Sequence, residues 1–253
     1  MAHEQGEGGF FEVTMWSTIL RARDGDEAIR VANMEKLLTK YRTPIYRHIM
    51  ASLRGWERTP ENAEDLTQGF IAQCLRLDFL RHVAPEKGRF RAFVRECVKN
   101  FLRDRHAEAS AAKRGGGVQP ASLDEVDEEG RPVIEPQAPS LTPEEALDRE
   151  WALTVLSSAM TALQEEYRAK GKEALFEALK PKLGQGTSSE TAADLAQRLG
   201  KTPEAVNVDV HRMKKQLAML VRQEIRPTVD TDEECQEELR YFVELLRGSA
   251  GES

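Results

Sequence analysis

Residues 59–106 read TPENAEDLTQGFIAQCLRLDFLRHVAPEKGRFRAFVRECVKNFLRDRH, and this stretch decides the fold class. Its apolar residues recur at intervals of three and four, which predicts two helices joined by a short polar loop. The buried face of the first helix is expected to consist of Leu66, Phe70, Cys74 and Leu77. The opposite, outward face consists of Asp65, Gln68, Ala72 and Arg76. We interpret this outward face as a surface for a protein partner.

The second helix of the stretch carries positive charge along one side. Cations recur there every four residues, at Arg91, Arg95, Lys99 and Arg103. Residues four apart share a helix face, so the four form one cationic stripe that can follow a phosphate backbone. The other side is apolar and consists of Phe90, Val94, Cys97 and Phe101. We interpret Phe90, Phe93 and Phe101 either as core residues or as platforms that stack on unpaired bases.

A second motif, SSETAADLAQRLGKTPEAVNVDVHRMKKQLAMLVR at 188–222, predicts a helix-turn-helix. Gly200 supplies the left-handed stop of the first helix, and Thr202 with Pro203 begins the second. The buried side of the second helix consists of Val206, Val210, Met213, Leu217 and Leu220. Its exposed side carries Glu204, Asn207, His211, Arg212, Lys214 and Lys215. In the major groove, arginine can pair with guanine and asparagine with adenine. Phosphates repel Glu204 and Asp209, which lie on the same helix.

Helix signals dominate the rest of the chain, and strand alternation is nearly absent, so the sequence predicts an all-α protein. Thr-Pro-Glu occurs at 59–61, 142–144 and 202–204, where threonine can cap a helix and proline fits its first position. Further helices are expected over 26–40 and 44–53. Residues 115–140 are rich in Gly, Pro and acid, a composition that cannot bury enough apolar surface to fold alone. We therefore expect a first helical domain at 1–114, an acidic flexible linker at 115–141, a second helical domain at 142–225 and an acidic amphipathic extension at 226–253.

The net charge of −7 is unevenly distributed along the chain. Residues 1–115 carry a net charge of about +4 and residues 151–225 about +2. The acid is concentrated in residues 116–150, at about −8, and in residues 226–253, at about −5. Both candidate binding domains are thus mildly basic, and the overall acidity does not argue against a nucleic-acid partner.

Two parts of the chain resemble bacterial RNA polymerase sigma factors of the extracytoplasmic-function (ECF) group. The resemblance to sigma region two lies in three stretches, NAEDLTQ at 62–68, PEKGRFRAF at 85–93 and NFL at 100–102. Sigma region four is similar to the helix-turn-helix at 188–222. The resemblance implies two small helical domains, one that docks on core polymerase and engages the −10 promoter element, and one that reads the −35 element.

The resemblance also implies roles for individual residues. Asp65, Gln68, Ala72 and Arg76 would contact the clamp helices of the polymerase β′ subunit, and the β flap is a second expected contact of the core enzyme. The expected contacts to −10 DNA are Lys87, Arg89, Arg91, Arg95, Lys99 and Arg103. His82 lies in the loop where the family holds an unstacked promoter base, and is either such a contact or an exposed loop residue. The acidic linker is either a tether or a segment that enters the RNA path of the polymerase.

The sequence predicts a cytoplasmic protein that is not itself an enzyme. It shows no nucleophile paired with a base, no phosphate-cradling glycine loop and no metal-ligand spacing, so no cofactor or metal is expected. Cys74, Cys97 and Cys235 are interpreted as reduced structural thiols. There is no apolar run long enough for a spanning helix, and the start of the chain lacks the pattern of a secretory signal.

Two further questions stay open from the sequence. The alternative function is a free-standing helix-turn-helix regulator that does not bind core polymerase; the Asp65 and Gln68 face discriminates, because a regulator of that kind needs no polymerase-docking surface. The C-terminal extension is expected either to pack on its own domain or to dock on a regulator, and an anti-sigma factor is the partner that the resemblance would supply.

Overall fold

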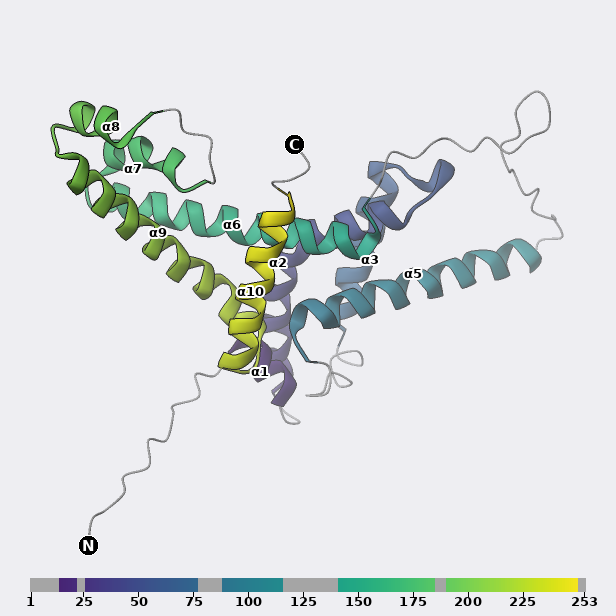
Figure 1. The fold of residues 1–253 in the computed structure, drawn as a ribbon. Coiled ribbons are helices and arrows are strands. Elements are labelled where there is room, and N and C mark those ends of the chain that lie inside the picture. Colours follow the sequence, from purple (N-terminus) through teal and green to yellow (C-terminus); the bar gives the residue numbers. More distant parts are fainter. Residues whose placement is uncertain (1–13, 22–25, 77–87, 116–140, 185–189, 250–253) are drawn as a thin grey trace, which may run out of the picture. The chain divides into compact units, whose positions relative to one another are not determined.

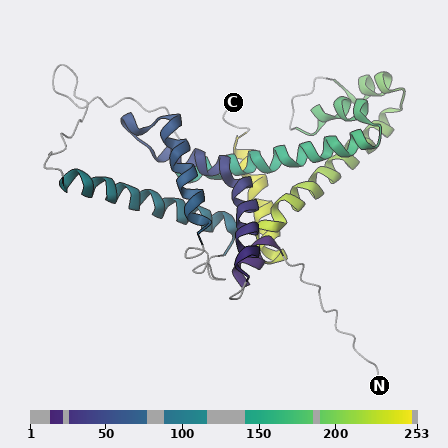
Figure 2. The ribbon, with the colours of Figure 1, turned by 180° about the vertical axis from the view of Figure 1, so that it is seen from behind.

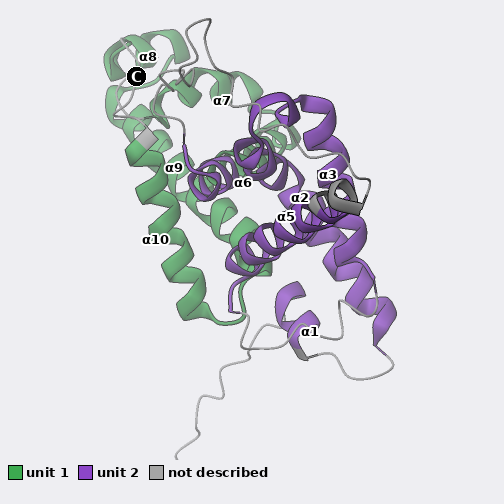
Figure 3. Cartoon of the chain, turned by 90° about the vertical axis from the view of Figure 1, so that its right-hand side faces the viewer, with its two compact units in different colours: residues 1–14, 152–253 green, residues 15–151 purple. Residues whose placement is uncertain are grey.

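The computed structural model describes residues 14–21, 26–76, 88–115, 141–184 and 190–249 (Figure 1). Every regular element in these ranges is a helix, which confirms the all-α prediction. The chain divides into two compact units, shown in purple and green in Figure 3. Unit 2 comprises residues 15–151, and unit 1 comprises residues 1–14 with 152–253. None of the helices in the described part is long and apolar enough to cross a membrane.

Unit 2 is built around one long helix, α2 (Glu27–Ser52), which contacts α1 (Met15–Arg21), α3 (Pro60–Cys74) and α5 (Phe90–Gly115) (Figures 1 and 2). A short 3₁₀ helix, η1 (Gly55–Glu57), follows α2. The expected break between 40 and 44 is wrong, because Pro44 is buried inside a continuous α2. Proline has no N–H to donate and usually kinks or ends a helix, which is why the sequence suggested two shorter ones.

Aromatic rings form the core of unit 2. The ring centroids of Tyr41 and Phe90 are 4.9 Å apart, and those of Phe70 and Phe101 are 5.6 Å apart, both with edge-to-face geometry. Such pairs contribute about 0.5–1.5 kcal/mol each beyond the burial of their area. Phe90, Phe93 and Phe101 are all buried, so the structure places them in the core and not on a stacking surface.

All three Thr-Pro-Glu sequences begin helices, as predicted. Thr59 and Thr202 each accept a hydrogen bond of 3.2 Å from the backbone N–H three residues later, at Asn62 and Ala205. Thr142 and Glu145 form a reciprocal capping box: the Glu145 N–H donates to the Thr142 hydroxyl, and the Thr142 N–H donates to the Glu145 carboxylate. The bond from the Thr142 N–H lowers the pKa of the Glu145 carboxyl, and a bond from the Thr142 hydroxyl to the same carboxylate acts in the same direction.

The boundary between the units differs from the expected domain boundary. The expected second domain begins at residue 142, but residues 143–151 of α6 (Pro143–Ala169) belong to unit 2. The physical reason is burial: Leu147 and Trp151 are almost fully buried, and Asp148 is paired with α5. Residues 116–140 of the expected linker lie outside the described residues.

Among its described residues, unit 1 contains the rest of α6 and six further helices. They are α7 (Glu173–Leu179), η3 (Lys180–Lys182), α8 (Ala192–Leu199), α9 (Pro203–Ile225), η4 (Arg226–Thr228) and α10 (Asp232–Ser249). Gln216 of α9 hydrogen-bonds to Glu166 of α6. Helix α10 packs against α9, with Cys235 and Phe242 buried, so the C-terminal extension packs within its own unit.

Helices α8 and α9 form the predicted helix-turn-helix. Thr191 and Asp194 make a capping box at the start of α8, and Leu195 and Ala196 are buried. Gly200 ends α8 with φ +63°, the left-handed cap expected from the sequence. On α9, Val206, Met213 and Leu220 are buried as predicted, whereas Val210 and Leu217 are only half-buried.

Replacing Gly200 by alanine is expected to lower the free energy of unfolding by about 1–2 kcal/mol, because an L-residue is strained in the left-handed region. Gly248→Ala in α10 is the matched control. Neither added Cβ would meet an atom within 4 Å, but Gly248 lies in a helix without a positive φ. The control should be neutral or stabilise by up to about 1 kcal/mol. Chemical denaturation measures both changes, and an equal loss in the two variants would contradict the left-handed cap.

Candidate functional site

The expected cationic stripe on α5 is only partly exposed. Lys99 and Arg103 are exposed and Arg95 is half-buried, but Arg91 is buried, with 9% of its surface accessible. The expectation that Arg91 lies on an exposed stripe is therefore wrong. Arg89, just before α5, is half-buried. Lys87 and His82 lie outside the described residues.

Asp148 of α6 is the reason why Arg91 is buried. An Nη1–H of Arg91 donates to Asp148 Oδ1 over 2.6 Å, and Arg95 Nη1 lies 3.7 Å from Asp148 Oδ2. The Arg91 guanidinium also lies over the Trp151 ring, 5.0 Å from its centroid. Asp148 thus pairs with two of the four cations that were expected to contact phosphate. We call Asp148, Trp151, Arg91 and Arg95 the α6 anchor.

The α6 anchor is a buried charge cluster and not a surface salt bridge. The side chain of Asp148 is only 5% exposed and that of Arg91 only 11%. Removing one partner of such a pair costs about 3–5 kcal/mol, because the other charge is left buried without compensation. By contrast, Arg103 pairs with the neighbouring Asp104 over 3.5 Å where both side chains are well exposed, and pairs of that kind contribute little. Arg91 is therefore held for structural reasons, whereas Lys99 and Arg103 are accessible to a ligand.

A second ion pair and a buried histidine lie beside the α6 anchor. Arg47 Nε of α2 is 3.5 Å from Glu150 Oε2 of α6. His48, the next residue of α2, is buried and hydrogen-bonds to the backbone of Pro143. Because proline has no N–H, the acceptor is its carbonyl oxygen, and the Nδ1 atom of His48 has no hydrogen-bond partner among the described residues.

Burial is the main reason why the pKa of His48 lies below its usual value of 6.5. The nearby guanidinium of Arg95 also lowers this pKa. The carboxylates of Glu144 and Asp148 and the bond to Pro143 act in the opposite direction without reversing the shift. The lowered pKa favours the neutral form of this imidazole, which lies beside the start of α6.

Sequence reasoning missed Asp148, Glu150, Arg47 and His48. One signal was present, because Asp148 precedes Trp151 by three residues and so lies on the face that the apolar periodicity marks as buried. A carboxylate at a buried position requires a cationic partner. The sequence does not show which of the many arginines supplies that partner.

The outward face of α3 is placed as predicted. Asp65, Gln68, Ala72 and Arg76 are all exposed, while Phe70 and Cys74 are buried on the other side. Glu64 beside this face receives hydrogen bonds from Gln68 Nε2, over 3.0 Å, and from Arg42 of α2, and these bonds lower the pKa of its carboxyl. The four exposed side chains form a surface on a helix that is fixed to the core.

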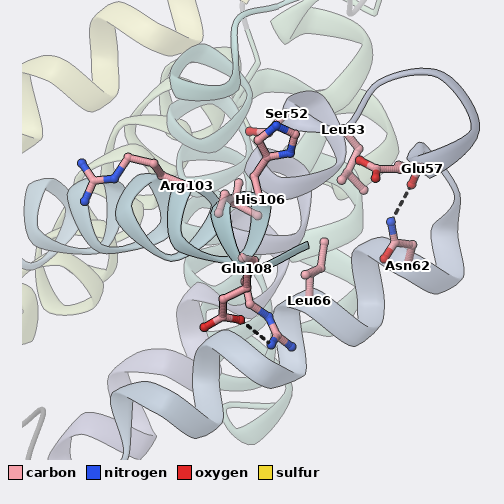
Figure 4. Close-up of a pocket in the computed structure, with 10 residues that line it drawn as sticks. Ser52, Leu53, Glu57, Asn62, Leu66, Arg103, His106 and Glu108 are labelled. Carbon is pink, nitrogen blue, oxygen red and sulfur yellow. Dashed lines mark hydrogen bonds and ion pairs between the residues drawn. The ribbon is translucent and has the colours of Figure 1, made fainter. Parts of the chain in front are cut away.

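A cleft of about 690 Å³ lies between α3, α5 and the end of α2 (Figure 4). Its apolar wall consists of Leu53, Leu66 and Leu102. The polar side chains from α5 are Arg103, Arg105, His106 and Glu108, and Arg105 pairs with Glu108 over 3.4 Å. On the opposite side, Asn62 Nδ2 donates to the Glu57 carbonyl over 2.8 Å. Arg103 points away from Asn62 and Glu57 in Figure 4, so it stays available on the outer side of α5.

The exposed side of α9 carries the six residues of this helix that are predicted to contact DNA. They are Glu204, Asn207, His211, Arg212, Lys214 and Lys215, and each is exposed. Of the two acids that phosphates would repel, Asp209 forms an ion pair with Lys201 from the turn, whereas Glu204 is exposed. This pairing offsets part of the unfavourable charge. Within unit 1, α9 thus presents a polar and mainly basic face suited to a polyanion.

The described residues contain no group of three or more His, Cys, Asp or Glu side chains placed to hold a metal ion. All three cysteines are free thiols, and burial raises the pKa of Cys74 and of Cys235. A scan against protein-family models, a search of curated proteins and a search of solved structures each find no match to this chain.

Acidification should destabilise the protein through His48. In the unfolded chain histidine titrates near its usual value, so below about pH 6.5 the unfolded state binds more protons than the folded state. The contribution is therefore complete above this pH and is lost as the pH falls toward the lowered pKa of the folded protein. We expect the free energy of unfolding to decrease between about pH 7 and pH 5.5, and less steeply in His48→Gln.

Denaturant titrations at several pH values measure this effect. His211→Gln, on the exposed face of α9, is the matched control and should keep the pH dependence of the unaltered protein. If His48→Gln and His211→Gln show the same slope, the buried imidazole is not the source of the effect.

Proposed function

We propose that this chain is a promoter-specificity subunit of the sigma type, which binds core RNA polymerase, recognises promoter elements at −35 and −10 and assists opening of the duplex. The observation that carries the proposal is the pairing of two surfaces on unit 2. Helix α3 presents Asp65, Gln68, Ala72 and Arg76 to solvent, and α5 of the same unit presents Lys99 and Arg103. A protein surface and a cationic surface on one small domain suit a subunit that holds polymerase and DNA together.

The helix-turn-helix of unit 1 supports the same proposal. Its second helix, α9, exposes Asn207 and Arg212, which can pair with adenine and guanine, together with Lys214 and Lys215, which suit phosphates. We assign this helix to the −35 element and α5 to the −10 region. The polymerisation chemistry would belong to the core enzyme, and the chain itself would act in the cytoplasm as a non-catalytic subunit.

Not all of the α5 cations expected to contact DNA are accessible for that role. Arg91 supports the fold through Asp148 and drops out of the DNA-contacting set. Arg95 is shared, because its side chain is 35% exposed but lies near Asp148. Lys99 and Arg103 are left as the principal phosphate contacts of α5.

Charge reversal at Asp65 combined with Gln68→Ala should abolish binding to core polymerase. Both side chains are exposed, so the free energy of unfolding should change by no more than about 0.5 kcal/mol. Glu35→Arg, at an exposed acid of α2, is the matched control and should bind as the unaltered protein does. Pull-down with purified core enzyme measures the effect. Full binding by the double variant would remove the support for polymerase docking and leave the free-standing regulator as the better function.

Loss of Arg212 should relax base preference at one position of the −35 element, at a cost of roughly 1–3 kcal/mol. Loss of Lys215 should instead weaken binding to all sequences alike. It should also lower the slope of log affinity against log salt concentration by about one. The measurement is transcription from a promoter library with the −35 element randomised, by Arg212→Ala, Lys215→Ala and unaltered protein. Arg240→Ala, exposed on α10, is the control for a lost surface charge. Identical preference profiles in all variants would show that α9 does not read bases.

A further inference from the structure

The helix before the acidic residues 116–140 and the start of the helix after them belong to the same unit, whatever the function of the chain. Helix α5, which precedes residues 116–140, belongs to unit 2. The chain that follows the segment, residues 143–151 of α6, belongs to the same unit. The division between the units falls after Trp151, inside α6. The described residues on both sides of the acidic segment therefore belong to one unit.

The start of α6 is held on unit 2 by two kinds of contact. Polar contacts come from the α6 anchor, in which Asp148 bridges Arg91 and Arg95, and from the ion pair of Glu150 with Arg47. Apolar burial comes from Leu147 and Trp151, which expose 0% and 2% of their surface. Asp148 is a buried carboxylate and needs a fixed cationic partner, so its contacts specify one position for the helix start.

We propose that residues 143–151 are an intramolecular docking segment, and that this segment, rather than the acidic residues 116–140, fastens the second half of the chain to unit 2. The receptor surface consists of Arg47 on α2 with Arg91 and Arg95 on α5, and it takes an acidic helix start that also supplies a buried tryptophan. Asp148 and Glu150 are the positioning residues of this segment. The acidic segment can then be cut without separating the two parts of the protein.

The test uses the full chain with a protease recognition sequence inserted after Gly130. After cleavage, the two fragments of the unaltered chain are expected to elute together on size-exclusion chromatography at micromolar concentration. Asp148→Arg places a third cation against Arg91 and Arg95, and should weaken the association of the fragments by about 100-fold or more. Separation of the unaltered fragments, or an unchanged association in Asp148→Arg, would overturn the proposal.

Two further variants keep the outcome decisive if Asp148→Arg disturbs folding. The charge swap Asp148→Arg with Arg91→Asp restores opposite charges at the same place and should recover most of the lost association. Glu165→Arg, at an exposed position later on α6, is the matched charge reversal and should have no effect. A charge swap no better than the single variant would mean that Asp148 does not act through Arg91.

Discussion

The arrangement of unit 2 depends on one buried carboxylate, Asp148, and on the two arginines that neutralise it. A charged group this far from water is tolerated only when oppositely charged hydrogen-bond partners stand beside it. Arg91 meets that requirement at 2.6 Å and stacks on Trp151, while Arg95 approaches from one turn further along α5. Because the anchor fixes α6 against α5, it also decides which cations on α5 are left for a ligand.

Because of this anchor, some charges of the chain pair within the protein while others stay accessible to a ligand. Part of the acid in residues 116–150 is paired with arginines of unit 2: Asp148 is buried against Arg91, and the half-buried Glu150 lies beside Arg47. The cations that stay accessible are Lys99 and Arg103 on α5 and the basic side of α9. Asp209 on α9 is countered by Lys201. An overall acidic chain can in this way carry basic local surfaces.

Much of the fold follows from local signals in the sequence. The Thr-Pro-Glu caps and the glycine stop at Gly200 each act over one or two turns, and each is where the sequence predicted it. On the apolar side predicted for α3, Phe70 and Cys74 are buried, Leu66 is half-buried, and Leu77 lies outside the described residues. The outward face of α3 and the exposed face of α9 were predictable for the same reason, since helical periodicity alone separates the two sides. The proline inside α2 was misjudged because tertiary burial overrode its usual effect.

The errors concern contacts between distant segments. Periodicity placed Arg91 on the polar side of α5 but could not show that α6, more than fifty residues later, covers that end of the stripe. Likewise, the change in composition at residues 115–140 marks a stretch with few large apolar side chains. It does not reveal to which unit the next helix start belongs, and that is decided by Leu147, Asp148 and Trp151.

The most direct measurement of the central claim is transcription by core RNA polymerase, with and without the purified chain, on fragmented genomic DNA with mapping of transcript 5′ ends. The account predicts transcripts that depend on the chain and begin at a fixed distance downstream of a shared pair of sequence elements. If the chain binds DNA by itself but yields no transcript start that requires it, the account is contradicted and a free-standing regulator is favoured.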